Sequence, residues 1–205
     1  MRKICEIGRS MVEMLGVLAI IGVLSVGGIA GYSKAMTKFK LNKHTEQIGS
    51  ILDGMHINLD TIKRSKTGIA TTMMASVMIG MGLIPEEMIK NNNQIYDVFG
   101  NPITIYNYFD GNKYYFEFVT TLGQDNMQAC LNLFQIAKLR SAMLYRTKFH
   151  FSQSDTNSSG NEVYGDAYCS DNVKCLKNFS LAEATDFCTI CEDKDTCVFY
   201  IQMVL

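Results

Sequence analysis

The sequence predicts an α+β fold in which one long N-terminal helix packs on a head with an antiparallel β-sheet and a disulfide-bonded C-terminal region. Three observations lead to this prediction. An apolar run continues without a break into an amphipathic helical pattern. Two aromatic, β-prone runs flank an Asp-Gly pair in the middle of the chain. Six of the seven cysteines lie in the C-terminal half.

The first element is the apolar run "MVEMLGVLAIIGVLSVGGIAGY", residues 11–32, in which Glu13 is the only charged residue. As a helix it is roughly 33 Å long, which is enough to cross the hydrocarbon core of a bilayer. Arg2 and Lys3 precede it, and a basic head tends to stay on the cytoplasmic side. We therefore expect a single membrane-spanning helix, with the chain from Lys34 onward on the opposite side.

A cleaved secretory signal peptide is the alternative, because the Gly28-Ile29-Ala30 stretch offers small residues for a cut after Ala30. Two features favour a retained helix. The run is longer than the usual apolar stretch of about 7–15 residues, and the helical pattern continues past Ala30. A retained segment raises a question about Glu13, since a carboxylate in hydrocarbon costs several kcal/mol unless it finds a partner.

Beyond the apolar run, apolar residues recur at spacings of three, four and seven, which is typical of one helical face. The residues of this face are Leu41, Ile48, Leu52, Met55, Leu59 and Ile62. We therefore expect one helix from about residue 9 to residue 64. Two helices joined by a hinge over residues 27–31 are the alternative, because each glycine there costs about 1 kcal/mol in a helix interior.

Turn residues and changes of period predict the remaining elements. These are a short buried helix over residues 72–82, a strand pair over 103–109 and 114–119, a helix over 125–145 and a final strand over 198–204. Pro85 follows the first of these helices, and Asp110-Gly111 stands between the paired strands.

Composition and motifs argue against an enzyme and against a nucleic-acid partner. The chain has 19 basic and 20 acidic residues and no dense basic patch. It has no glycine-rich phosphate loop, no G-x-S-x-G and no H-E-x-x-H. His44 and His56 lie on the expected long helix without a nearby nucleophile, and His150 lies beside the polar loop of residues 152–166. We expect no enzymatic activity and no cofactor or metal.

The start of the chain resembles the class III leader of type IV prepilins, because Gly8 ends the basic head and Glu13 is the fifth residue after it. The resemblance implies that prepilin peptidase cuts after Gly8 and that Arg9 becomes the first mature residue, usually methylated. Arg9 departs from the family, which has an apolar residue there. The resemblance also implies that Glu13 pairs with the N-terminal amine of a neighbouring subunit. An i,i+4 pair between Arg9 and Glu13 within one helix is the alternative.

The middle of the chain is similar to the type IVb pilins, a group that includes the toxin-coregulated pilin and the conjugative thin pilins. The similarity lies at Pro85, Phe99-Gly100, Ile103 to Ile105 and Ala129-Cys130. It implies a pilin fold with three parts. These are a leader peptide over residues 1–8, a long helix over 9–64 whose residues 9–32 form the transmembrane and assembly segment, and a globular head over 65–205.

A cut after Gly8 would remove Cys5 and leave six cysteines in the translocated part. These are Cys130, Cys169, Cys175, Cys188, Cys191 and Cys197. An even number in an oxidising compartment indicates a disulfide framework. The family pattern ties Cys130 to a late cysteine, which leads us to expect the pairs Cys130–Cys191, Cys188–Cys197 and Cys169–Cys175. A zinc site built from Cys169, Cys175, Cys188 and Cys191 is the alternative.

The resemblance implies that the chain is a structural subunit of a type IVb-like pilus, used for adhesion, aggregation or conjugation. The implied partners are other copies of itself, other pilins, prepilin peptidase, the inner-membrane assembly platform and the membrane. The implied location is the inner membrane, by a single pass with the head in the periplasm, and then an extracellular pilus. A pseudopilin of a type II secretion system and a monomeric, membrane-anchored ligand-binding domain are the alternatives.

Overall fold

The structure is a computed structural model that forms two compact units, residues 1–40 and residues 41–205. It describes residues 11–64, 72–109, 112–123, 126–150, 161–192 and 197–204. We call residues 41–205 the head. The predicted cleavage site at Gly8 and Arg9, Cys5, and the predicted turn at Asp110-Gly111 lie outside the described residues.

The first helix, α1, spans Met11–Ile57, and a short helix α2 follows over Leu59–Arg64. Helix α1 continues through residues 27–31 without a break, so the structure has no hinge at these glycines. The long helix ends at Ile57, short of the predicted end at residue 64. The backbone N–H and the side-chain amide of the next residue, Asn58, both donate to the Gly54 carbonyl, at 3.2 and 2.8 Å. A side chain that competes for a helical carbonyl in this way favours a helix end over continuation.

Eight strands among the described residues form one sheet in which all strand pairs are antiparallel. They are β1 (Thr72–Met73), β2 (Ile89–Lys90), β3 (Gln94–Tyr96), β4 (Pro102–Phe109), β5 (Tyr114–Leu122), β6 (Arg146–His150), β7 (Glu162–Tyr164) and β8 (Cys197–Val204). Their order is β2-β3-β4-β5-β8-β6-β7, and β1 pairs with β4. A long N-terminal apolar helix, an antiparallel sheet and disulfides thus agree with the predicted α+β class.

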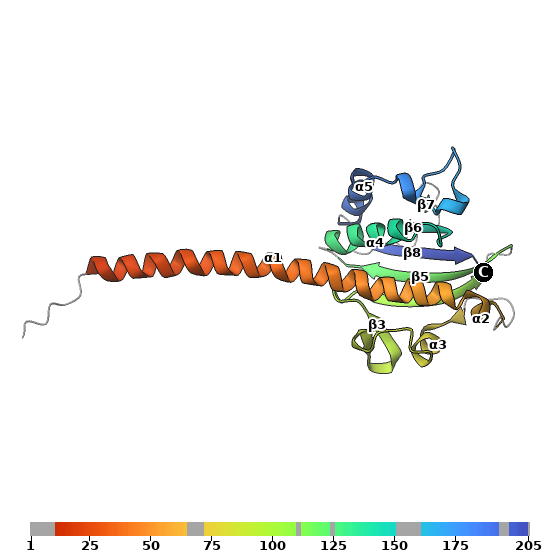
Figure 1. The fold of residues 1–205 in the computed structure, drawn as a ribbon, viewed down its shortest axis with the longest axis horizontal. Coiled ribbons are helices and arrows are strands. Elements are labelled where there is room, and N and C mark those ends of the chain that lie inside the picture. Colours follow the sequence, from red (N-terminus) through yellow and green to blue (C-terminus); the bar gives the residue numbers. More distant parts are fainter. Residues whose placement is uncertain are drawn as a thin grey trace, which may run out of the picture. The chain divides into compact units, whose positions relative to one another are not determined.

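The predicted hairpin is confirmed, since β4 and β5 pair in register from Ile103 opposite Thr120 to Phe109 opposite Tyr114. The predicted final strand is also confirmed as β8. It lies in the middle of the sheet, between β5 and β6, as Figure 1 shows. Because β8 is central, it forms hydrogen bonds with a strand on each side. It therefore brings β5 and β6 next to the C-terminal residues of the chain.

The remaining described helices are α3 (Ala75–Gly80), α4 (Met127–Leu139), α5 (Leu181–Glu192) and the short 3₁₀ turns η1 (Glu86–Met88), η2 (Asn91–Asn93), η3 (Asp166–Tyr168) and η4 (Leu176–Asn178). Helix α4 ends at Leu139, short of the predicted end at 145, because the chain turns there through hydrogen bonds of Arg140 and Ser141 to preceding carbonyls. Residues 72–82, predicted as one short buried helix, instead form the strand β1 and the six-residue helix α3. Met78 is fully buried, whereas Met73 and Val77 expose 62% and 47% of their surface.

One hydrophobic core joins the head part of α1, α4, α5 and one face of the sheet. Alternate residues of the strands point into it, as period-two strands require. The core side chains from α1 are Ile48, Ile51, Leu52 and Met55, each with no exposed surface. Burial of each such side chain is worth about 1.5–3 kcal/mol, so the amphipathic half of α1 is a central element of the head.

Candidate functional site

The apolar half of α1 has large hydrophobic side chains exposed around its whole circumference. Met14, Leu24 and Ile29 expose 61%, 69% and 70% of their surface, and the other large apolar side chains of residues 15–26 expose more than half. Among the described residues, this is one helix that is long and apolar enough to cross a membrane, with a mean hydropathy of 2.2 in its most apolar window. An apolar surface of this kind is unfavourable in water and needs lipid or other helices around it.

Glu13 lies in the first turn of α1, on this apolar half, and its side chain is exposed. The helix N-terminus carries partial positive charge, which favours a carboxylate at this position. The proposed partners of Glu13, the Arg9 side chain and a new N-terminal amine, lie outside the described part of the chain. Both the intermolecular pair and the intrahelical alternative therefore stay predictions.

A buried polar cluster fixes the head part of α1 to the loop between β3 and β4 and to α4. His44 of α1 is fully buried, with its Nε2 3.2 Å from Asp97 Oδ2 and its Nδ1 3.0 Å from Asn132 Nδ2. Its ring meets the Phe99 ring edge-on at 5.2 Å between centroids. The Gln47 side chain accepts the backbone N–H of Val98 at 3.1 Å. These contacts join three elements through side chains that no local sequence pattern connects.

Asp97 holds the shape of the β3–β4 loop. Its Oδ1 accepts the backbone N–H groups of Phe99 and Asn101, each at 2.8 Å, and its Oδ2 accepts the Asn101 side-chain amide at 2.9 Å. Gly100 has a φ of +87°, a backbone conformation that favours glycine. The Phe99-Gly100 pair that carried the family resemblance therefore has a local role: a turn that delivers Asp97 and Phe99 to His44.

Two ion pairs at more exposed positions also attach the head part of α1 to the rest of the head. Arg140, just after α4, donates to both carboxylate oxygens of Asp53 at 2.8 and 2.9 Å. A Cβ added at Gly49 would lie 2.5 Å from Arg140 Nη2, so this glycine leaves room for the guanidinium to cross the helix. Lys43 Nζ lies 2.8 Å from Glu87 Oε1. Its hydrogen bond lowers the pKa of Glu87 and raises that of Lys43.

All six predicted cysteines form disulfides, but two of the three predicted pairs are wrong. The bonds are Cys130–Cys188, Cys191–Cys197 and Cys169–Cys175, with Cα atoms 5.8, 5.5 and 5.5 Å apart. The pair Cys169–Cys175 is as predicted, whereas Cys130–Cys191 and Cys188–Cys197 are not formed. The zinc alternative requires thiolates, and in this structure these six sulfur atoms are bonded to one another.

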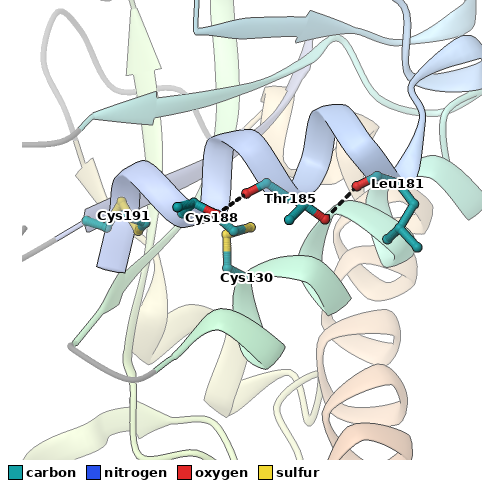
Figure 2. Close-up of a disulfide and its surroundings, with 7 residues drawn as sticks. Cys130, Leu181, Thr185, Cys188 and Cys191 are labelled. Atoms are coloured by element: carbon teal, nitrogen blue, oxygen red, sulfur yellow. Dashed lines mark hydrogen bonds between the residues drawn. A yellow bond between two sulfur atoms is a disulfide. The ribbon is translucent and has the colours of Figure 1, made fainter. Parts of the chain in front are cut away.

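The orientation of α5 explains why Cys130 pairs with Cys188 and not with Cys191. Figure 2 shows Cys188 facing Cys130 of α4, with Cys191 further along α5 near its end. Cys188 has no exposed surface, so it points at the core-facing side of α4. Cys191, one helical turn later, lies within bonding distance of Cys197 at the start of β8. Disulfides need Cα atoms about 4.4–6.8 Å apart, and the packing of α5 on α4 decides which cysteine meets that condition.

A charged network covers the sheet face opposite to the core, and sequence reasoning missed it. Arg146 donates to Gln202 Oε1 at 2.6 Å and to Glu162 Oε1 at 2.8 Å. The Gln202 side-chain amide donates to Glu117, and Lys148 Nζ lies 3.7 Å from the same carboxylate. Burial lowers the pKa of Lys148, while the charge of Glu117 opposes this shift. Period-two alternation of charged residues in β6 was the available signal.

A pocket of about 500 Å³ lies beside the small Cys169–Cys175 disulfide loop. Its lining is mostly polar and includes the charged residues Asp171, Lys174, Lys177 and Glu183. The volume is in the range of small-molecule pockets. A ligand-binding function, the alternative from another class, would be sought here.

No protein-family model matches the chain, and no curated protein shows a significant sequence match to it. The geometry described above therefore carries the functional argument. Its main feature is an exposed apolar helix that continues into the core of a disulfide-bonded head.

Proposed function

We propose that the chain is a structural subunit of a type IVb-like pilus. In this proposal prepilin peptidase removes residues 1–8, the head crosses the inner membrane into the periplasm, and the apolar helices of many copies bundle in a filament core. One observation carries the proposal: a helix with exposed apolar side chains on every side is continuous with the buried spine of the head.

Exposure on every side limits what can cover the helix. A partner that packs on one face leaves the other faces in water, which is unfavourable for so many apolar side chains. A bilayer surrounds a helix completely, and so does a bundle of like helices. The same surface therefore suits both a membrane-bound subunit before assembly and a core helix after assembly.

Glu13 gives assembly a driving force in this proposal. A carboxylate in an apolar environment is costly while it lacks a partner, and a pairing cation removes that cost. A neighbouring subunit that brings its N-terminal amine to Glu13 would stabilise the filament over the dispersed subunits in the membrane. Glu13 is the only acidic residue between the start of α1 and Glu46.

A filament subunit must also hold its head firmly on its helix. The His44–Asp97 contact, the Arg140–Asp53 pair and the Lys43–Glu87 pair tie the head part of α1 to three other regions of the head. The three disulfides support a head that folds in an oxidising compartment. Both features agree with a translocated head anchored through α1.

The test is to express the chain with a prepilin peptidase and a type IV assembly platform, and to shear the cells. We expect the sheared filament fraction to contain the chain with Arg9 as its first residue. A Gly8→Leu variant, in which cleavage is blocked, should stay in the membrane fraction with residues 1–8 attached. A chain that starts at Gly31, or that never enters filaments, would contradict the proposal. A chain confined to the periplasm would favour the pseudopilin, and one that remains a membrane-bound monomer would favour the ligand-binding domain.

A further inference from the structure

The part of α1 that follows the apolar run has an unusual set of exposed side chains. Tyr32 and Phe39 expose 68% and 62% of their surface. Lys34, Lys38 and Lys40 are also exposed, and no ion pair joins them to another described residue. We call residues 32–40 the belt. It belongs to the N-terminal unit of the chain, in which α1 is one continuous helix.

Helical geometry distributes these side chains around the whole circumference. At about 100° per residue, Lys34 and Lys38 lie on one side of the helix, four residues apart. Tyr32 and Phe39, seven residues apart, share a second side. Lys40 lies on a third. The belt therefore differs from an amphipathic stripe that packs on a single partner, and resembles the ring of aromatic and basic residues that surrounds a helix at a membrane interface.

The charges of the belt are all of one sign. From residue 14 to residue 45, the chain has no aspartate, glutamate or arginine, and its lysines are Lys34, Lys38, Lys40 and Lys43. Lys43 already has the carboxylates of Glu46 and Glu87 at 3.3 and 2.8 Å. The proposed topology puts these lysines on the side of the membrane where basic residues are disfavoured. Three lysines at this membrane boundary, with no ion pair to another described residue, would be stabilised by a bound anion.

We propose that the belt binds the headgroups of acidic phospholipids in the leaflet on the side of the head. The inference rests on the membrane-spanning part of the proposed function, and not on filament assembly. Residues 32 to 40 extend over roughly 12 Å of helix, and a headgroup layer is about 5–7 Å thick on each side of the hydrocarbon core. Flexible lysine side chains can reach the phosphates from these positions, while the Tyr32 ring, at the end of the apolar run, lies at the boundary of the hydrocarbon core.

The acidic lipid is favoured over a soluble anion because the belt continues directly into the apolar run. Insertion of that run puts the belt at headgroup depth without further cost. Each lysine near an anionic surface contributes about 1 kcal/mol, which is about fivefold in affinity. Three lysines together give a preference that is large enough to measure, and that falls when salt screens the charges.

The test uses the full chain in mixed micelles with equal amounts of phosphatidylglycerol and phosphatidylcholine of the same acyl chains. Native mass spectrometry counts the lipids of each class that stay bound. We expect the wild type to retain phosphatidylglycerol preferentially. In the variant Lys34→Gln/Lys38→Gln/Lys40→Gln, the preference for phosphatidylglycerol should fall about fivefold for each lysine replaced. Glutamine has nearly the helix propensity of lysine, so α1 should be preserved.

The control is Lys90→Gln/Lys113→Gln, which removes two exposed charges from the head outside the pocket beside the Cys169–Cys175 loop. It should keep the preference of the wild type. The proposal is overturned if the wild type shows no preference, if the belt variant keeps it, or if the head variant loses it equally. None of these results depends on filaments, so failure here is distinguishable from failure of the proposed assembly.

Discussion

Asp97 is the side chain on which the attachment of α1 to the β3–β4 loop depends. Its carboxylate accepts three hydrogen bonds, from Phe99 and Asn101, and approaches His44. Asp97→Ala would leave these buried donors without an acceptor, at about 1–3 kcal/mol each. We expect a loss of at least about 3 kcal/mol in the free energy of unfolding, measured by urea unfolding of the detergent-solubilised chain.

Two further variants make this prediction specific. Asp97→Asn keeps one carbonyl oxygen for the two backbone N–H groups and should cost less than Asp97→Ala. Asp53→Ala removes a half-exposed carboxylate that pairs with Arg140, and such pairs are worth less than about 1 kcal/mol. Equal losses for Asp97→Ala and Asp53→Ala would show that the buried cluster has no special role.

Sequence reasoning finds some of these residues and not others, for a physical reason. Glu13 stands out because it is a charge in an apolar run, which is a local contrast. His44 does not stand out, since one polar residue on a helix face reveals nothing about a carboxylate 53 residues later. Only the fold brings His44, Asp97 and Asn132 together.

Among the secondary-structure elements, α5 has a complete N-terminal capping box. The Ser180 N–H and hydroxyl both donate to Glu183 Oε2 at 2.8 Å, and the Glu183 N–H donates to Ser180 Oγ at 3.2 Å. The hydrogen bond from the Ser180 backbone, followed by that from its hydroxyl, lowers the pKa of the Glu183 carboxyl below its ordinary value of 4.5. Because the pKa of Glu183 is lower in the folded chain than in the unfolded chain, its ionised carboxylate stabilises the fold at any pH above the ordinary pKa. This stabilisation is lost as the pH falls through the lowered pKa of the folded chain.

We therefore expect Glu183→Gln to destabilise the chain at pH 7 and to have a smaller effect in acid. The measurement is the difference in urea midpoint between wild type and variant at pH 7 and at about pH 3. Asp186→Asn removes a carboxylate from the same helix without touching the cap, and serves as the control. A difference that stays constant with pH would contradict the role of the cap.

The Cys130–Cys188 disulfide ties α4 to α5 across a sequence separation of 58 residues. In the chain-entropy model, a loop of this size contributes roughly 4 kcal/mol. Cys130→Ser should therefore destabilise the head strongly and release one thiol. Alkylation followed by tandem mass spectrometry should find that thiol at Cys188. A label at Cys191 would restore the pairing that the family resemblance implied.

Elements with a strong local signal could be predicted from the sequence, and elements fixed by packing could not. The long helix, the β4–β5 hairpin and β8 follow from periodicity and turn residues. Helix α5 was missed, although Ser180-x-x-Glu183 is a capping-box signature. The cysteine pairing was wrong because Cys188 and Cys191 are one turn apart on α5. Their choice of partner depends on how α5 packs, which sequence spacing does not determine.

The whole molecule combines two units with opposite surface requirements. The head buries its apolar side chains in one core, whereas the apolar half of α1 exposes them. A soluble monomer would leave this surface in water. Such a surface needs lipid or other helices around it. In the proposed function, Glu13 is the residue that distinguishes simple anchoring from assembly.

The most direct test of the proposed assembly is the filament yield of Glu13→Gln against wild type, measured by shearing and immunoblotting in cells with the full assembly machinery. The variant removes the charge and keeps the size of the side chain. Ser25→Ala, a change at another polar position in the same segment, is the control. The account predicts that Glu13→Gln is cleaved and membrane-bound but absent from filaments, while Ser25→Ala assembles. A normal filament yield from Glu13→Gln would contradict it.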